Sequence, residues 1–237
     1  MSQESSPESR REELAGRLAE VRRRIDVARD AAGRDDEVGL VVVTKLFPAS
    51  DQDLVTELGV EAVGENRDQE ASRKVAELTH RSRLTVHFIG QLQSNKAASV
   101  ARYADVVQSV DRPKLVGALE RATGAAGRRL DVTVQVSLDP DEGRGGVAPE
   151  KARVLADLVA GTPALTLRGV MAVAPLDGDP RAAFARLREV SDGIRHDHPE
   201  ATWISAGMSG DLEAAIAEGA THLRVGSAIL GSRESHR

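Results

Sequence analysis

The chain has no cysteine and very few aromatic residues. Among its 237 residues are three Phe, one Tyr and one Trp, so that aromatic residues make up 2% of the sequence. Without cysteine, the protein can form no disulfide, thiol nucleophile or thiolate metal site. The low aromatic content leaves Tyr103 as the single candidate for a tyrosine acid.

Long apolar runs and a strong excess of one charge are also missing. No run approaches the roughly 20 apolar residues of a membrane-spanning helix, and residues 1–11 lack the apolar core of a signal peptide. Lys and Arg number 32 against 37 Asp and Glu, giving a formal net charge of −5, without a broad basic footprint for nucleic acid. We therefore expect a cytoplasmic protein with no nucleic-acid or membrane partner. Because its helices are amply charged, we favour a monomer.

Short apolar runs alternate with segments of helical composition along most of the chain. A helical pattern over about residues 12–32 follows an N-terminal tail, residues 1–11, that we expect to be disordered. The predicted strands are 40–44, 61–63, 86–89, 105–110, 132–138, 167–173, 203–206 and 222–225. The predicted intervening helices are 51–58, 67–78, 95–102, 113–126, 150–160, 181–196 and 211–217. Eight such units most economically close into a (β/α)8 TIM barrel, so we expect an α/β fold with one barrel domain over residues 12–237. An open doubly wound sheet is the alternative, but its G-x-G-x-x-G fingerprint is absent.

Lys45 directly follows the apolar run 40–44, which has the composition of a strand buried on both faces. Taken alone, this position most simply means that the strand has reached solvent and that the ammonium group extends into water. The other interpretation is a partly desolvated lysine with a lowered pKa that can form a Schiff base. The segments after the last two predicted strands favour the second interpretation.

These two segments carry residues suited to a phosphate group. Ser205, Gly207 and Ser209 follow the seventh strand and precede a predicted helix, and Gly226 and Ser227 follow the eighth. Hydroxyls, close backbone approach and a helix N-terminus favour an anion. Phosphate sites in barrels commonly use these two loops. A lysine facing such a site across a barrel mouth predicts pyridoxal 5′-phosphate (PLP), which has an aldehyde and a phosphate.

Two other features remain open at this stage. His87 could be a general base, but one histidine in an apolar strand is more often a core residue with a satisfied hydrogen bond. The Gly143–Gly146 loop could bind an anion or fold over the mouth, and a mobile solvated loop is at least as plausible.

From about Glu12 to Arg233, the sequence resembles the YggS/PROSC family of PLP homeostasis proteins, which are related to the barrel domain of alanine racemase. The motifs that carry the resemblance are Val43-Thr44-Lys45, Gly64-Glu65-Asn66, the block from His87 to Lys96, Arg168-Gly169-Val170-Met171-Ala172, Gly207-Met208-Ser209, and Arg224-Val225-Gly226-Ser227. The ten-residue block from His87 to Lys96 is specific by itself.

The resemblance implies a role for each matching position. Lys45 would hold PLP as a Schiff base, Arg224 would face the pyridine nitrogen, and Asn66 and Met171 would lie beside the cofactor. The phosphate would be lined by Ser205, Gly207, Met208, Ser209, Gly226 and Ser227. Because arginine cannot accept a proton, it disfavours a protonated pyridinium and so weakens PLP as an electron sink.

The resemblance implies a protein of intracellular PLP homeostasis that buffers or delivers PLP, with PLP-dependent apoenzymes as recipients, rather than an enzyme with rapid turnover. An amino-acid racemase is the alternative. Racemisation requires acid–base groups on both faces of the substrate α-carbon, and related racemases take a tyrosine from a second domain. Tyr103 is expected away from the mouth, which favours the binding protein.

Overall fold

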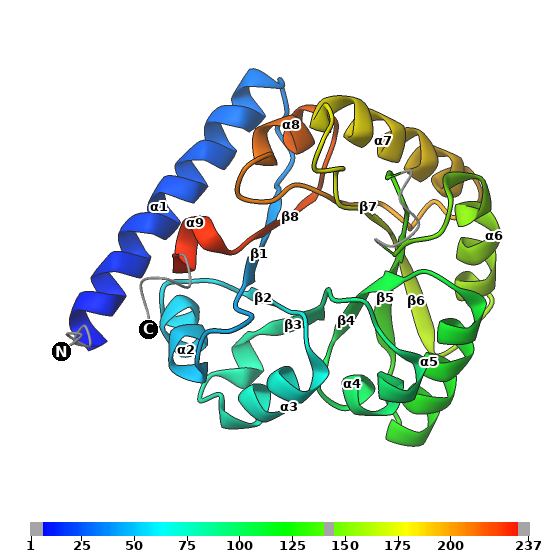
Figure 1. Cartoon of the computed structure of the whole chain (residues 1–237), viewed down its shortest axis with the longest axis horizontal. Coiled ribbons are helices and arrows are strands. Elements are labelled where there is room, and N and C mark those ends of the chain that lie inside the picture. Colours follow the sequence, from blue (N-terminus) through cyan, green and yellow to red (C-terminus); the bar gives the residue numbers. More distant parts are fainter. Residues whose placement is uncertain (1–6, 140–144, 232–237) are drawn as a thin grey trace.

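The computed structural model describes residues 7–139 and 145–231. Within them, eight parallel strands form a closed barrel in chain order, as the centre of Figure 1 shows. The strands are β1 (Gly39–Val43), β2 (Ala62–Glu65), β3 (Thr85–Phe88), β4 (Val106–Val110), β5 (Leu130–Gln135), β6 (Leu165–Met171), β7 (Trp203–Ser205) and β8 (His222–Val225). The expected (β/α)8 barrel is confirmed.

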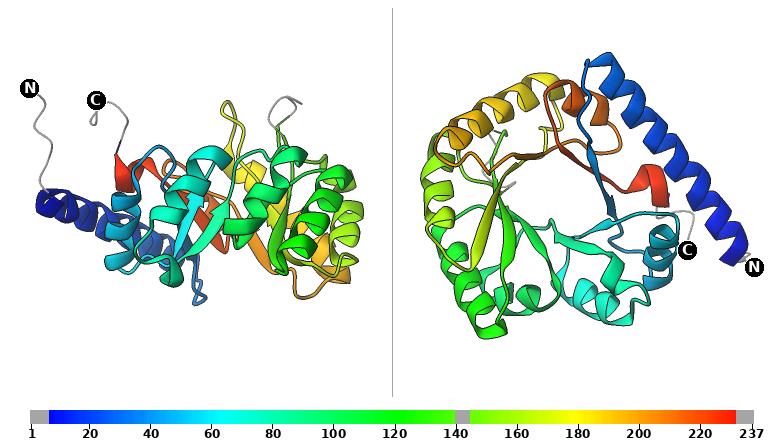
Figure 2. Two further views of the ribbon diagram at one scale, coloured as in Figure 1. Left: turned by 90° about the horizontal axis from the view of Figure 1, so that it is seen from below. Right: turned by 180° about the vertical axis from the view of Figure 1, so that it is seen from behind.

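Helices surround the barrel on its outside (Figures 1 and 2). They are α1 (Pro7–Ala31), α2 (Ala49–Glu57), α3 (Asp68–Glu77), α4 (Ala97–Tyr103), α5 (Pro113–Ala126), α6 (Pro149–Ala160), α7 (Pro180–Asp197), α8 (Leu212–Ala217) and α9 (Ser227–Leu230), with 3₁₀ turns η1 (Arg81–Arg83) and η2 (Ser94–Lys96). Each helix after α1 follows one strand. The strand arrows in the side view of Figure 2 point toward the side on which the β6–α7 loop projects.

The main apolar core lies between the strands and the helices. On β1, Val42 belongs to this core, whereas Val41 and Val43 line the barrel interior, where both lie against Gly64 of β2. This alternation follows from the two-residue period of a strand. Buried leucines on the helices, such as Leu14 and Leu18 of α1, complete the layer.

The start of α1 differs from the sequence-based expectation. The helix begins at Pro7, so residues 7–11 are helical and the expected disordered tail is wrong for this part; residues 1–6 lie outside the described residues. Arg10 is buried and pairs with Asp51 of α2 at 2.7 Å. Since α8 and α9 are only six and four residues long, α1 packs against both of them and covers this side of the barrel (Figure 1).

The predicted strands are all present, with shifts of up to three residues at their ends. The fifth and sixth begin two residues earlier than expected, at Leu130 and Leu165. The polar residues Asp131 and Thr166 interrupt the apolar pattern at these starts, although Asp131 forms an ion pair of 2.8 Å with Arg168 of β6. The helix α9 and the turn η1 were not predicted.

Candidate functional site

All ten predicted site residues lie at or just beyond the carboxyl ends of strands, at one mouth of the barrel. Lys45 follows β1, Asn66 follows β2, and Met171 and Ser205 end β6 and β7. Arg224 lies in β8, four further residues lie in the loops after β7 and β8, and Ser227 begins α9. Because β1 pairs with β8, with Val42 opposite Val225, the segment carrying Lys45 runs beside the segment carrying Gly226.

Arg224 is a buried charged group of this mouth. Its side chain donates to the Ser205 hydroxyl at 2.8 Å and to the Ala172 carbonyl oxygen at 2.7 Å. The residue is 4% exposed, and burial lowers its pKa from 12.5 to about 10. The guanidinium group therefore stays charged at neutral pH and can only donate hydrogen bonds.

A chain of hydrogen bonds continues from Arg224 into the barrel. The Ser205 hydroxyl donates to the Gln108 side-chain oxygen at 2.7 Å, and the Gln108 amide lies 2.8 Å from Nδ1 of His87. Since the amide nitrogen can only donate, Nδ1 accepts, and the neutral imidazole carries its proton on Nε2. Burial lowers the pKa of His87 to about 3, with a smaller contribution from His222. His87 is thus a hydrogen-bonded core residue, as its position in an apolar strand favoured.

Gln108 was not singled out in the sequence. It lies in the middle of β4, between Val107 and Ser109 of a strand that is otherwise valine, and its side chain is fully buried. An uncharged amide within an apolar strand is the signal that could have identified it, because a barrel interior near a site tolerates polar groups only in hydrogen-bonded networks.

The loops after β7 and β8 meet through their serines. The Ser227 hydroxyl donates to the Ser209 hydroxyl at 3.2 Å, and the Ala228 amide donates to Ser209 at 3.3 Å. Ser209 therefore contacts the start of α9 in the neighbouring loop instead of capping the helix that follows it. That helix, α8, begins only at Leu212 and is short, and Asp211 accepts a hydrogen bond from the Met208 amide at 2.5 Å. If these loops hold a phosphate, as predicted, the serine hydroxyls are the local donors more than the dipole of the six-residue α8.

Gly207 is required by the geometry of the first of these loops. Its φ is 90°, and a Cβ atom would lie 2.6 Å from the Cβ of Ala215. We expect Gly207→Ala to lower the free energy of unfolding by roughly 2 kcal/mol and to weaken phosphate binding, as measured by urea denaturation and by titration with inorganic phosphate. Gly210→Ala in the same loop is the control, because a Cβ there meets nothing within 4 Å; equal effects of both substitutions would contradict the prediction.

Lys45 is exposed in the structure. The expectation of a partly desolvated side chain is therefore wrong for the protein alone, because β1 ends at Val43 and only Thr44 remains buried beyond it. A buried polar cluster that the sequence analysis did not identify lies next to this residue. It consists of Thr44, Gln52, Glu65, Glu70 and Lys74.

Asn66 and Met171 follow or end neighbouring parts of the barrel, and neither is exposed. The half-buried Asn66 packs so closely against Gly90 that a Cβ there would lie 2.1 Å from the Asn66 carbonyl oxygen. Met171 is buried at the end of β6, opposite Ser205 of β7 in the register. Within the described residues, no hydrogen bond joins the side chains of Lys45, Asn66 and Met171 to those of Arg224 and the serines.

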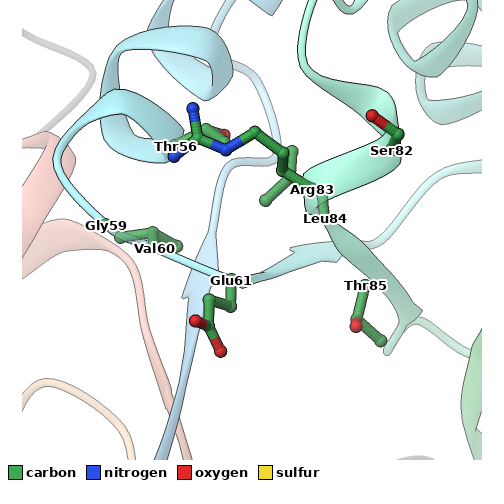
Figure 3. Close-up of a pocket in the computed structure, with 8 residues that line it drawn as sticks. All are labelled: Thr56, Gly59, Val60, Glu61, Ser82, Arg83, Leu84 and Thr85. Carbon is green, nitrogen blue, oxygen red and sulfur yellow. The ribbon is translucent and has the colours of Figure 1, made fainter.

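The structure has a hollow on the side of the predicted site and another at the opposite end of the barrel. One of about 170 Å³ lies beyond the ends of β5 and β6, lined in part by Gln135, Gly145 and Leu176. Of the Gly143–Gly146 loop, only Gly145 and Gly146 lie within the described residues. The hollow in Figure 3, of about 400 Å³, is lined by Glu61, Arg83 and neighbouring residues at the start of β2 and β3, at the opposite end of the barrel.

Neither metal binding nor membrane spanning finds support in the parts of the chain that the structure describes. In residues 7–139 and 145–231, His, Asp and Glu side chains nowhere form a group of three that could hold a metal ion. Among the described helices, none combines the length and apolar character that crossing a bilayer requires.

Comparisons with known proteins show the family to which the chain belongs. The family described as alanine racemase, N-terminal domain, matches residues 17–234. The pyridoxal phosphate homeostasis protein of Mycobacterium tuberculosis is 44% identical over 243 residues, covering 94% of each chain. PipY of Synechococcus elongatus, solved with PLP bound, is 35% identical with a TM-score of 0.81, covering 92% of this chain and all of PipY.

A more distant similarity concerns the fold alone. Alanine racemase from Corynebacterium glutamicum is 14% identical with a TM-score of 0.69, covering 92% of this chain and 60% of the racemase. The two proteins share the barrel fold over the part of the racemase that is covered. The chain thus belongs to the alanine racemase N-terminal domain family and, within it, to the pyridoxal phosphate homeostasis proteins.

Proposed function

We propose that this protein binds PLP at the barrel mouth and serves intracellular PLP homeostasis by holding the cofactor and releasing it to PLP-dependent apoenzymes. The observation that carries the proposal is the buried Arg224, held by Ser205 and Ala172 beside two serine-bearing loops. Lys45 extends from the neighbouring strand end. An amine, a fixed guanidinium group and a hydroxyl cradle match the aldehyde, the ring nitrogen and the phosphate of PLP.

The residues of the mouth fit this ligand in chemistry and in space. Arg224 has five N–H donors, and its hydrogen bonds to Ser205 and Ala172 leave others to meet a ring nitrogen. Gly226 allows its loop to pack closely on β1, since a Cβ there would lie 3.1 Å from the Val43 carbonyl oxygen. Bound PLP would supply an aldehyde that condenses with the Lys45 amine, releasing one water molecule. Ser209, Ser227 and the backbone of Gly207 and Met208 would hold the phosphate.

The racemase alternative lacks its acid in this chain. Tyr103 is buried on α4, and burial together with nearby Asp68 and Glu65 raises its pKa above the usual value. At 7% exposure, Tyr103 is enclosed by protein and not open to a substrate. We therefore propose a binding protein without rapid turnover of amino acids.

The test is a titration of the purified protein with PLP, followed by addition of amino acids one at a time. We expect a visible Schiff-base band that persists, with no racemised or deaminated product by chiral chromatography. Rapid band shifts with product formation would establish an enzyme instead. Absence of a band at saturating PLP would overturn the proposal.

Arg224→Gln tests the contact with the ring nitrogen. Glutamine is neutral and shorter, so the pyridine nitrogen would lose its cationic neighbour, and we expect a shifted visible spectrum and roughly tenfold weaker PLP binding. The measurement is a PLP titration followed by absorbance, with circular dichroism as the control for folding. An unchanged spectrum in a folded variant would contradict the assignment.

A further inference from the structure

Lys45 occupies the second position of a strained turn. The Phe47 amide donates to the Thr44 carbonyl oxygen at 3.1 Å and closes a four-residue turn. Leu46, the third residue, has φ of 72° and is the only non-glycine residue with positive φ in the described part of the chain. This value matches a type II turn, which normally places glycine or asparagine there.

Leucine at this φ is unfavourable by roughly 1–2 kcal/mol because its Cβ approaches backbone oxygen. Leu46 is 39% exposed, so packing of its side chain compensates only in part. The turn therefore needs support from groups outside it.

That support comes from two side chains of α3. Glu70 accepts a hydrogen bond from the Leu46 amide. Lys74 donates to the Thr44 carbonyl oxygen at 2.9 Å and to Glu70 at 3.1 Å. The residues immediately before and after Lys45 are thus both held by this one pair of side chains.

Lys74, which supports this turn, is itself held by buried polar groups. Lys74 is 5% exposed and forms an ion pair of 2.8 Å with Glu65, which is fully buried. Glu65 also accepts from the Thr44 hydroxyl at 2.7 Å and from Gln52 at 2.5 Å. Burial raises the pKa of Glu65, and the Lys74 ammonium group opposes this shift. All three N–H bonds of Lys74 have acceptors, so its direction is set.

We propose that Lys74 and Glu70 are positioning residues that hold the turn at Lys45 in its strained conformation and so aim the Lys45 amine into the barrel mouth. The inference rests on the proposed function of Lys45, and goes beyond it by assigning the residues that orient this side chain. Neither residue touches the ligand in this account. Both act through the backbone of Thr44 and Leu46.

The test uses Glu70→Leu, which removes the acceptor for the Leu46 amide and leaves the Lys74–Glu65 ion pair. We expect the Kd for PLP to rise roughly tenfold, in line with the strain that must then be overcome, and less PLP to be fixed at Lys45 by borohydride after a set time. Glu70→Gln keeps an acceptor oxygen and should stay within about twofold of the wild type. Folded Lys74→Met should show the same rise in the Kd for PLP as Glu70→Leu.

A second substitution separates positioning from general destabilisation. Leu46→Gly removes the strain, since glycine adopts positive φ freely, so Glu70→Leu combined with Leu46→Gly should regain most of the wild-type affinity. Failure of this rescue, or unchanged binding by Glu70→Leu alone, would overturn the positioning role. The control is Arg128→Met, which removes a cation bonded to Asp105 and to the carbonyl oxygens of Ala101 and Arg102 before β4, far from the mouth. Absence of PLP binding in the wild type and in this control would refute the proposed function itself.

Discussion

Replacing Lys45 with alanine is expected to abolish covalent attachment of PLP. The visible band should be absent at every PLP concentration, and borohydride reduction should fix no PLP to the protein. The reason is chemical: only an amine can condense with the aldehyde, and Lys45 is the predicted amine at the mouth. Noncovalent binding through Arg224 and the serines should remain, with affinity weaker by a factor of about ten or more.

The matched control is Lys96→Ala. Lys96 belongs to η2, directly after β3, where its ammonium group lies 3.9 Å from Asp68. We expect this variant to keep the band and to yield a PLP-modified peptide containing Lys45 after reduction and proteolysis. A borohydride-trapped product that persists in Lys45→Ala would assign the Schiff base to another amine.

The second large effect is acid sensitivity caused by His87. Burial lowers its pKa from 6.5 to about 3, so between these values the unfolded chain binds a proton that the folded chain does not. Stability therefore falls as the pH falls below about 6.5. At pH 5 the loss from this one residue is about 2 kcal/mol relative to neutral pH. Urea denaturation at pH 7 and pH 5 measures it.

His87→Gln should reduce this pH dependence, because its neutral side chain can still accept a hydrogen bond from Gln108. Burial also lowers the pKa of His222, to about 4. His222 therefore also destabilises the folded protein as the pH falls, and this contribution remains in His87→Gln. The control is His196→Gln, at an exposed position of α7. It should leave the difference in unfolding free energy between pH 7 and pH 5 as it is in the wild type. An equal loss of stability in wild type and His87→Gln would show that other groups cause the acid sensitivity.

The alternation of apolar strands and amphipathic helices was sufficient to predict the barrel. The run ending at Thr44 and the serine-rich segments near Ser209 and Ser227 could be placed at one mouth, because parallel strands bring their carboxyl ends to the same side. The element ends were less predictable. Asp131 and Thr166 obscured the starts of β5 and β6, since both are polar and become neighbours only when the two strands pair.

The sequence by itself determined the barrel, its mouth and the residue types suited to PLP, because strand and helix periods and the motif residues are local properties of the chain. Only the tertiary structure decided which buried polar groups hold the residues of the mouth in place. Gln108 is joined to Ser205 across 97 positions of the sequence, and Lys74 reaches Thr44 across 30. Such partners depend on the distances and directions that strand pairing and helix packing create, and no local pattern encodes them.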